Sequence, residues 1–241
     1  MKGIKIRPNI RIGSAIGVDE LFRDGYKAIF IGTGVWNPKT LGIKGESFGN
    51  VHYAINYLNN PDVYKLGEKV IVIGAGNAAM DVARTALRHG ARELTCFSLS
   101  KKVAASQYEF SYAQLEGVKF EYGRKPIEIV DEGVIFRDVT ENEDGTFTEV
   151  PGSDALYPAD SVIISISQGP QSTLVRTTTG LNASPRGLLE VDDAGRTSRP
   201  GIFASGDVVN GARTVVEAVA YSKRVAEAMH EYIQSSLNAN R

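Results

Sequence analysis

The residues best suited to chemistry form the run Gly74-Ala75-Gly76-Asn77-Ala78-Ala79. Apolar, strand-forming residues 70–73 precede it, and apolar residues at helical spacing follow it as far as Gly90. Such a turn can bind a dinucleotide: one glycine allows the tight turn, the next lets a pyrophosphate approach the backbone, and a small third residue lets helix and strand pack closely. The helix N-terminus then offers free N–H groups and a positive dipole end to the phosphates. We therefore expect these six residues to bind a cofactor; a turn that only needed glycines is the weaker interpretation.

The choice of cofactor depends on what stands at the end of the next strand, Glu93–Leu99. An acid about twenty residues past the glycines binds the ribose 2′-OH of NAD, whereas cationic groups bind the 2′-phosphate of NADP. This strand end has no acid. Its polar residues are Ser98, Ser100, Lys101 and Lys102. The pattern favours NADP, with NAD as the alternative, and a solvated loop is the other interpretation of the two lysines.

The rest of the chain alternates strands, helices and turns, which predicts an α/β fold with a Rossmann-like nucleotide-binding domain. Short segments between 118 and 150 are separated by Gly- and Asp-containing turns and predict an antiparallel meander of four strands. The break Asn59–Asp62 predicts a hinge before the central unit. We expect further strands at 3–12, 27–31, 93–99, 161–167 and 202–204, short helices at 18–22 and 51–58, and a long final helix buried through Val215, Val219, Ala226, Met229 and Ile233.

Composition excludes several classes of function. The 241 residues carry a net charge of −1 without long runs of one sign, which gives no electrostatic support for a nucleic-acid or membrane partner. The chain has no signal peptide and no apolar segment of membrane-spanning length, so a cytoplasmic location is the default. The single cysteine, Cys96, excludes an intramolecular disulfide and a cysteine-ligated iron–sulfur cluster, and its buried strand predicts a core residue. The three histidines lack ligand spacing, so we assign no metal and no catalytic residue.

The segment 70–86, with sequence VIVIGAGNAAMDVARTA, resembles the NADPH-binding segment of the glutamate synthase small-subunit family of FAD- and NAD(P)-dependent oxidoreductases. Further matches to that family are Ile31–Trp36, Gln168–Pro170 and Arg199–Asp207, together with the helix that follows Thr214. They occur in the family's order and span nearly the whole chain.

The resemblance implies a fold like that of the pyridine nucleotide-disulfide oxidoreductases. An NAD(P)-binding domain at 62–167 would be inserted into a partial FAD-binding domain at 1–61 and 168–241, and hydride would pass from NADPH to FAD. Gly206, Asp207 and Thr214 match the family's flavin site. Ser167 and Gln168 stand at its nicotinamide loop, where the family has Gly-Gln.

Besides Ser167, the chain departs from this family in two further respects. The first is that no second glycine fingerprint and no cysteine-rich iron–sulfur region precede the matched segments, so we expect the C-terminal part of a longer enzyme, without bound flavin and inactive alone. Its partner would be the missing N-terminal region or an electron-transfer subunit. A stand-alone NAD(P)-binding or sensing module is the alternative. The second is that Ser98 and Leu99 stand where the family has two arginines.

Overall fold

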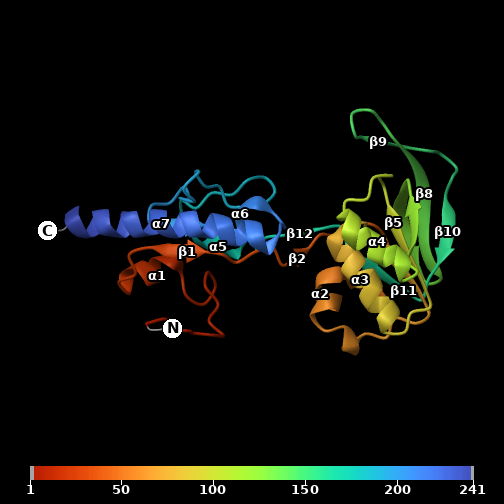
Figure 1. The fold of residues 1–241 in the computed structure, drawn as a ribbon, viewed down its shortest axis with the longest axis horizontal. Helices are drawn as coiled ribbons and strands as arrows, with labels where there is room; N and C mark the ends of the chain where they lie inside the picture. Colours follow the sequence, from red (N-terminus) through yellow and green to blue (C-terminus); the bar gives the residue numbers. More distant parts are fainter. Residues whose placement is uncertain (1–2, 240–241) are drawn as a thin grey trace. The chain divides into compact units, whose positions relative to one another are not determined.

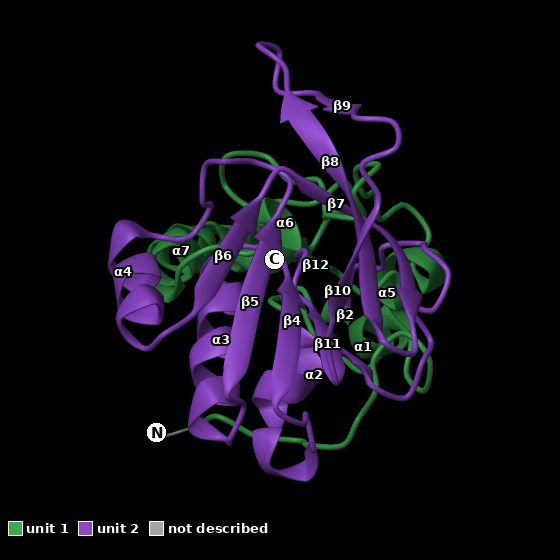
Figure 2. Cartoon of the chain, turned by 90° about the vertical axis from the view of Figure 1, so that its right-hand side faces the viewer, with its two compact units in different colours: residues 1–37, 168–241 green, residues 38–167 purple. Residues whose placement is uncertain are grey.

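The computed structural model describes residues 3–239, which divide into two compact units. Unit 1 comprises residues 1–37 and 168–241, and unit 2 comprises residues 38–167 (Figure 2). The chain leaves unit 1 once and returns to it once, so unit 2 is an insertion. The two-residue strands β2 (Asn37–Pro38) and β12 (Gln168–Gly169) lie at these crossings and pair with each other.

Unit 2 is built around a parallel sheet of five strands, covered on one face by helices (Figures 1 and 2). The helical elements are α2 (Ala54–Asn59), the 3-10 turn η1 (Pro61–Val63), α3 (Asn77–Arg88) and α4 (Gln107–Leu115). Across the sheet the strands run in the order β3 (Val51–Tyr53), β11 (Ser161–Ile164), β4 (Lys69–Ile73), β5 (Glu93–Ser98) and β6 (Lys119–Tyr122).

Strand β4 is the centre of both cores of unit 2. Val70 and Val72 pack on one face with the helices, in a cluster that includes Met80 of α3. Ile71 and Ile73 pack on the other face, in a separate cluster. Successive side chains of a strand point to opposite faces, so a strand buried on both faces must be apolar at every position. This explains the uninterrupted run from Val70 to Ile73.

The second face of the sheet is covered by antiparallel strands. Phe136 of this layer stacks on Phe97 of β5, with ring centroids 4.1 Å apart. β8 pairs with both β7 and β10, and β9 pairs with the end of β8. The strands are β7 (Arg124–Val130), β8 (Gly133–Glu141), β9 (Phe147–Glu149) and β10 (Ala155–Pro158).

The meander was therefore predicted only in part. Its expected first strand, now β6, runs parallel to β5 and belongs to the main sheet, so that assignment is wrong. A parallel neighbour needs a crossover, which α4 supplies and the sequence analysis missed. The apolar residues of α4 do not gather on one buried face, since Tyr108 is 67% and Leu115 82% exposed. Strand β10 was also not foreseen.

Unit 1 has a small core around two parallel strands, β1 and β13. Val18, Ile31, Ile202 and Val208 are buried together there. The elements of unit 1 are α1 (Val18–Arg23), β1 (Ile29–Ile31), α5 (Thr173–Thr177), β13 (Ile202–Ala204), α6 (Asp207–Asn210) and α7 (Val215–Ala239). No helix in the described part of the chain combines the length and hydropathy that crossing a bilayer requires.

Three further expectations differ from the structure. Unit 2 begins at Pro38 rather than at Asp62, because β3 pairs with β11 and α2 packs on α3. Residues 3–12 contain no ladder strand, only an isolated bridge from Ile12 to Ile16. Residues 51–58 are divided between β3 and α2.

The buried stripe expected on α7 is also wrong in most of its positions. Val215 is 78% and Val219 49% exposed, and Ala226 is exposed as well. The fully covered side chains are Val225 and Ala228, which pack with Phe203. The helical period is correct, but the face that packs on Phe203 of β13 is the one that carries Val225 and Ala228.

One backbone position provides a test of stored strain. Ser167 has a φ of +95°, a region that costs an L-residue about 1–2 kcal/mol. Ser167→Gly removes that cost, and the larger entropy loss of glycine offsets about 0.5–1 kcal/mol of the gain. We expect the free energy of unfolding to rise, by up to about 1.5 kcal/mol, as measured by urea denaturation. The control Ser165→Gly, at a position outside the positive-φ region, should lower it; equal changes in both variants would contradict this account.

Candidate dinucleotide-binding site

Gly74 is required by the fold itself. Its φ is +132°, and a Cβ at this position would lie 2.2 Å from the carbonyl oxygen of Ser165. Its N–H donates to the carbonyl of Phe97 at 2.8 Å. Only glycine allows β4 to end this close to the segment after β11.

Gly76 is different, because the folded chain does not need a glycine there. It is the N-cap of α3 with φ −89°, and a Cβ would meet no atom within 4 Å. Its carbonyl accepts the N–H groups of Ala79 and Met80, which closes the first turn of α3. Ala79 is completely buried. The space next to Gly76 is thus open, directly before a helix N-terminus whose first N–H groups have no partner within the helix.

This turn lies where the strand order of the sheet reverses. From β4 the chain moves through α3 to β5 and then β6, whereas β11 and β3 lie on the other side of β4. Ligands of open α/β sheets bind in the crevice at the carboxyl ends of the strands on either side of such a point. Gly74 follows β4 and Ser165 follows β11, which places both at this edge.

The loop after β5 folds back onto the glycine turn. The N–H groups of Ala104 and Ala105 donate to the carbonyl of Ala75, and the N–H of Ser106 donates to Oδ1 of Asn77 at 2.8 Å. Asn77 was predicted to bind the cofactor, and in the structure its side chain holds this loop. Ser106 was missed, although a serine three residues before Glu109 is a helix-capping signal.

The polar residues after β5 lie in different environments. Ser98 pairs with Tyr122 in the ladder between β5 and β6. Lys101 and Lys102 are exposed. The hydroxyl of Ser100 donates to Oε2 of Glu141 at 2.8 Å and accepts the N–H of Lys102 at 3.0 Å. Glu141, at the end of β8, was not anticipated, because nothing in its local sequence indicates a place beside β5.

The expected nicotinamide loop begins with Ser167, whose φ of +95° lies in a region that glycine adopts readily. The Ser167 carbonyl accepts the N–H of Lys39 at 3.1 Å. Gln168 lies in β12 of unit 1. Ser167 and Gln168 therefore fall on either side of the division between the two units.

In unit 1, Gly206, Asp207 and Thr214 lie along one groove with a volume of about 520 Å³. Gly206 precedes α6 with φ +78°, and Oδ1 of Asp207 accepts the N–H of Arg213 at 3.2 Å. Thr214 precedes α7, and its hydroxyl and N–H both donate to Glu217. These bonds hold the pKa of the Glu217 carboxyl below its usual value. The structure thus brings together the three residues that the sequence assigned to the flavin.

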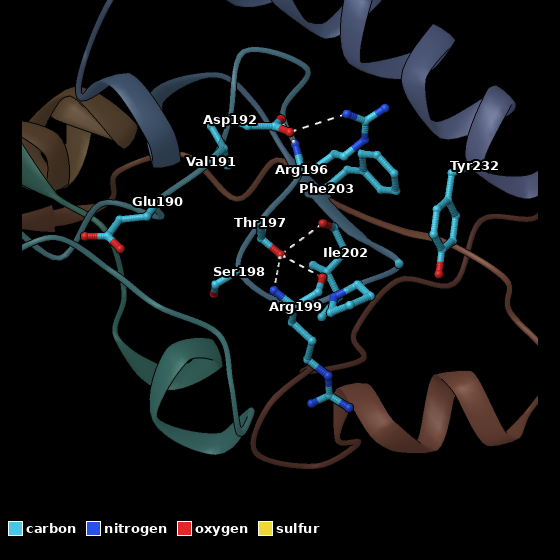
Figure 3. Close-up of a pocket in the computed structure, with 12 residues that line it drawn as sticks. Glu190, Val191, Asp192, Arg196, Thr197, Ser198, Arg199, Ile202, Phe203 and Tyr232 are labelled. Carbon is cyan, nitrogen blue, oxygen red and sulfur yellow. Dashed lines mark hydrogen bonds and ion pairs between the residues drawn. The ribbon is translucent and has the colours of Figure 1, made fainter.

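A second cavity of about 500 Å³ in unit 1 is drawn in Figure 3. Its polar groups are largely paired with one another. The hydroxyl of Thr197 donates to the carbonyls of Arg199 and Ile202, and Arg196 lies 3.4 Å from the Asp192 carboxylate. These bonds stabilise the hairpin that precedes β13, and we assign the cavity no ligand.

The single cysteine and the possible metal ligands give no further candidate site in the described residues. Cys96 lies in β5 and is buried, which raises the pKa of its thiol from 9.0 to about 12. Across the described residues 3–239, His, Cys, Asp and Glu side chains do not gather in any group able to hold a metal ion.

Together, a parallel sheet, a glycine turn at the reversal of strand order and a helix N-terminus define unit 2 as a Rossmann-like unit. The chain belongs to the pyridine nucleotide-disulphide oxidoreductase family, whose model matches residues 6–222.

Curated relatives confirm the similarity to glutamate synthase small chains. The glutamate synthase [NADPH] small chain of Escherichia coli is 29% identical over 96% of this chain and 56% of its own length. The NADP(+)-dependent formate dehydrogenase subunit beta of Moorella thermoacetica is 33% identical over 96% of this chain and 35% of its own length. The chain therefore spans about a third to a half of these two relatives.

Solved structures confirm the fold. Thioredoxin reductase of T. acidophilum matches with a TM-score of 0.68 and 25% identity, over 87% of this chain and 66% of that chain. FprA of Mycobacterium tuberculosis, solved in complex with NADPH, matches with a TM-score of 0.75 over 96% of this chain and 69% of that chain. At 16% identity the second match supports the fold alone.

The raised pKa of Cys96 predicts a thiol that does not react in the folded protein. At pH 8 the thiolate fraction of a group with a pKa near 12 is about one part in ten thousand, and burial adds a steric barrier. We expect a thiol reagent such as dithionitrobenzoate to label Cys96 only at the rate of unfolding. The chain in urea should react at once, and rapid stoichiometric labelling of the folded protein would contradict this interpretation.

Proposed function

We propose that this chain supplies the pyridine-nucleotide-binding unit and part of the flavin-binding unit of an oxidoreductase that passes hydride from NADPH to FAD. The observation that carries the proposal is the open space beside Gly76, at the N-terminus of α3 and at the reversal of strand order. A pyrophosphate there would accept N–H groups and lie at the positive end of the helix dipole.

The identity of the nucleotide is supported by two independent observations. Lys101 and Lys102 are exposed beside the end of β5, where cations suit a 2′-phosphate. The names of the Escherichia coli and Moorella thermoacetica relatives describe enzymes that use NADPH or NADP(+). Both observations favour NADPH over NADH for this chain.

The groove of unit 1 fits part of a flavin. The Asp207 carboxylate has acceptor capacity beyond the single N–H that it binds, so it can accept a hydroxyl of a ribityl chain. Apolar side chains, Phe30 and Val219 among them, line the same groove and can cover a flavin ring. FAD, when bound, would accept the hydride, so that the flavin is reduced as NADPH is oxidised.

The first test separates binding from folding at the glycine turn. Gly76→Val places a branched side chain where the pyrophosphate would lie, while the chain itself leaves that space free. Charge-assisted hydrogen bonds contribute about 1.5–3 kcal/mol each, so we expect at least a tenfold loss of NADPH affinity by calorimetry.

The matched control is Gly49→Val. Gly49 is exposed in unit 2, and a Cβ there also meets no atom within 4 Å. This variant should keep the parent's affinity. Equal NADPH affinity of Gly76→Val and the parent would show that the site is wrongly placed. If the protein binds NADPH but no flavin, even at its full length, the result would favour the alternative function, a nucleotide-binding or sensing module without catalysis.

The second test concerns the two lysines. Lys101→Ala with Lys102→Ala should lower NADPH affinity by about tenfold and leave NADH affinity nearly unchanged, because only NADPH carries the 2′-phosphate. Lys65→Ala with Lys119→Ala removes the same charge before β4 and at the start of β6, at the amino ends of the strands. If both double variants give the parent's ratio of NADPH to NADH affinity, the lysines have no role in cofactor choice.

A further inference from the structure

An acidic side chain reaches the end of β5 from a segment forty residues later in the chain. The Ser100 hydroxyl donates to Oε2 of Glu141, with a separation of 41 positions and a distance of 2.8 Å. The same hydroxyl accepts the N–H of Lys102. One serine thus joins the carboxylate of β8 to the loop that carries the two lysines.

The antiparallel layer places Glu141 at this edge. Phe136 of β8 stacks on Phe97 of β5, the residue just before Ser98. Val139 donates its N–H to the carbonyl of Gly123, which keeps the end of β8 close to the turn after β6. Glu141 is the last residue of β8, and its carboxylate meets Ser100, two residues past the end of β5.

The loop with Ser100 is also tied to the glycine turn. Residues 104–106 donate three backbone N–H groups to Ala75 and Asn77. The Glu141 carboxylate is therefore bonded to the loop that borders the glycine turn, beside the end of β5. In Rossmann folds that strand end is next to the 2′ position of the adenosine ribose.

The bonding at Ser100 favours one 2′ group over the other. A serine hydroxyl has a single proton, and in this structure Glu141 accepts it. A 2′-phosphate could take that proton only by displacing a carboxylate that also repels it. A ribose 2′-OH, in contrast, can donate to the carboxylate, as it does to the acid of NAD-binding folds.

We propose that Glu141 is a specificity-determining residue, which opposes the 2′-phosphate of NADPH and accepts the 2′-OH of NADH. This inference rests on the dinucleotide function proposed above for unit 2. Glu141 and the lysines then act in opposite directions, and the balance between them sets the ratio of NADPH to NADH affinity.

The test is Glu141→Gln, with NADPH and NADH titrated by calorimetry against the protein. 2′,5′-ADP and 5′-AMP serve as probes that differ in the 2′-phosphate alone and need no nicotinamide contact. We expect the NADPH-to-NADH affinity ratio to rise at least tenfold, about 1.4 kcal/mol, and the ratio for the two probes to rise in parallel. Glu141 is exposed, so the unfolding midpoint should remain near that of the parent.

The matched control is Glu143→Gln. Glu143 is an exposed acid two residues further along the same hairpin, so this variant changes the net charge equally. Its ratio should stay within twofold of the parent's. An unchanged ratio in Glu141→Gln, or an equal rise in Glu143→Gln, would overturn the proposal. If the parent binds neither dinucleotide, the proposed function itself fails, which is a separate outcome.

Discussion

The structure of unit 2 depends on the burial of β4 on both of its faces. Val70 and Val72 hold the helices against the sheet, and Ile71 and Ile73 hold the antiparallel layer on the other side. Complete burial of such side chains stabilises a fold by about 1.5–3 kcal/mol each. A strand fixed from two sides ends at a defined place, so the turn that follows it is positioned without help from a ligand. Strand β4 thus has a structural role, and the candidate binding site is the turn at its carboxyl end.

The two glycines of that turn lie in different environments. The fold itself requires glycine at position 74, because a Cβ there would clash with the Ser165 carbonyl. The packing of the chain does not require glycine at position 76, because the space beside it is open. Open space alone does not mark a site, since Gly49 has it too; at Gly76 it adjoins the N-terminus of α3 and the reversal of strand order, where a ligand can use the free N–H groups. The sequence does not separate these two positions, because both are simply glycine, whereas the structure shows a different environment beside each.

The sequence predicted what local pattern determines. The β4–turn–α3 unit, β5, β11, β13 and the long α7 follow from apolar periodicity and glycine punctuation. What it missed depends on distant partners. The direction of β6 depends on α4, whose apolar residues show no single buried face. The first boundary lies at Pro38 because β3 pairs with a strand more than a hundred residues later. The buried face of α7 depends on where Phe203 lies.

The same limit applies to the site, and it has a physical origin. A rule that looks for an acid about twenty residues past the glycines assumes that the neighbouring strand supplies the whole ribose subsite. Here a second layer lies on the sheet, and its longest strand, β8, ends with Glu141 against Ser100, in the loop that follows β5. Charge acts through space, so a carboxylate on any strand that reaches the edge changes the local potential. Cofactor preference in a layered fold of this kind therefore follows from the sum of charges at one edge of the sheet, and a single strand end gives only part of it.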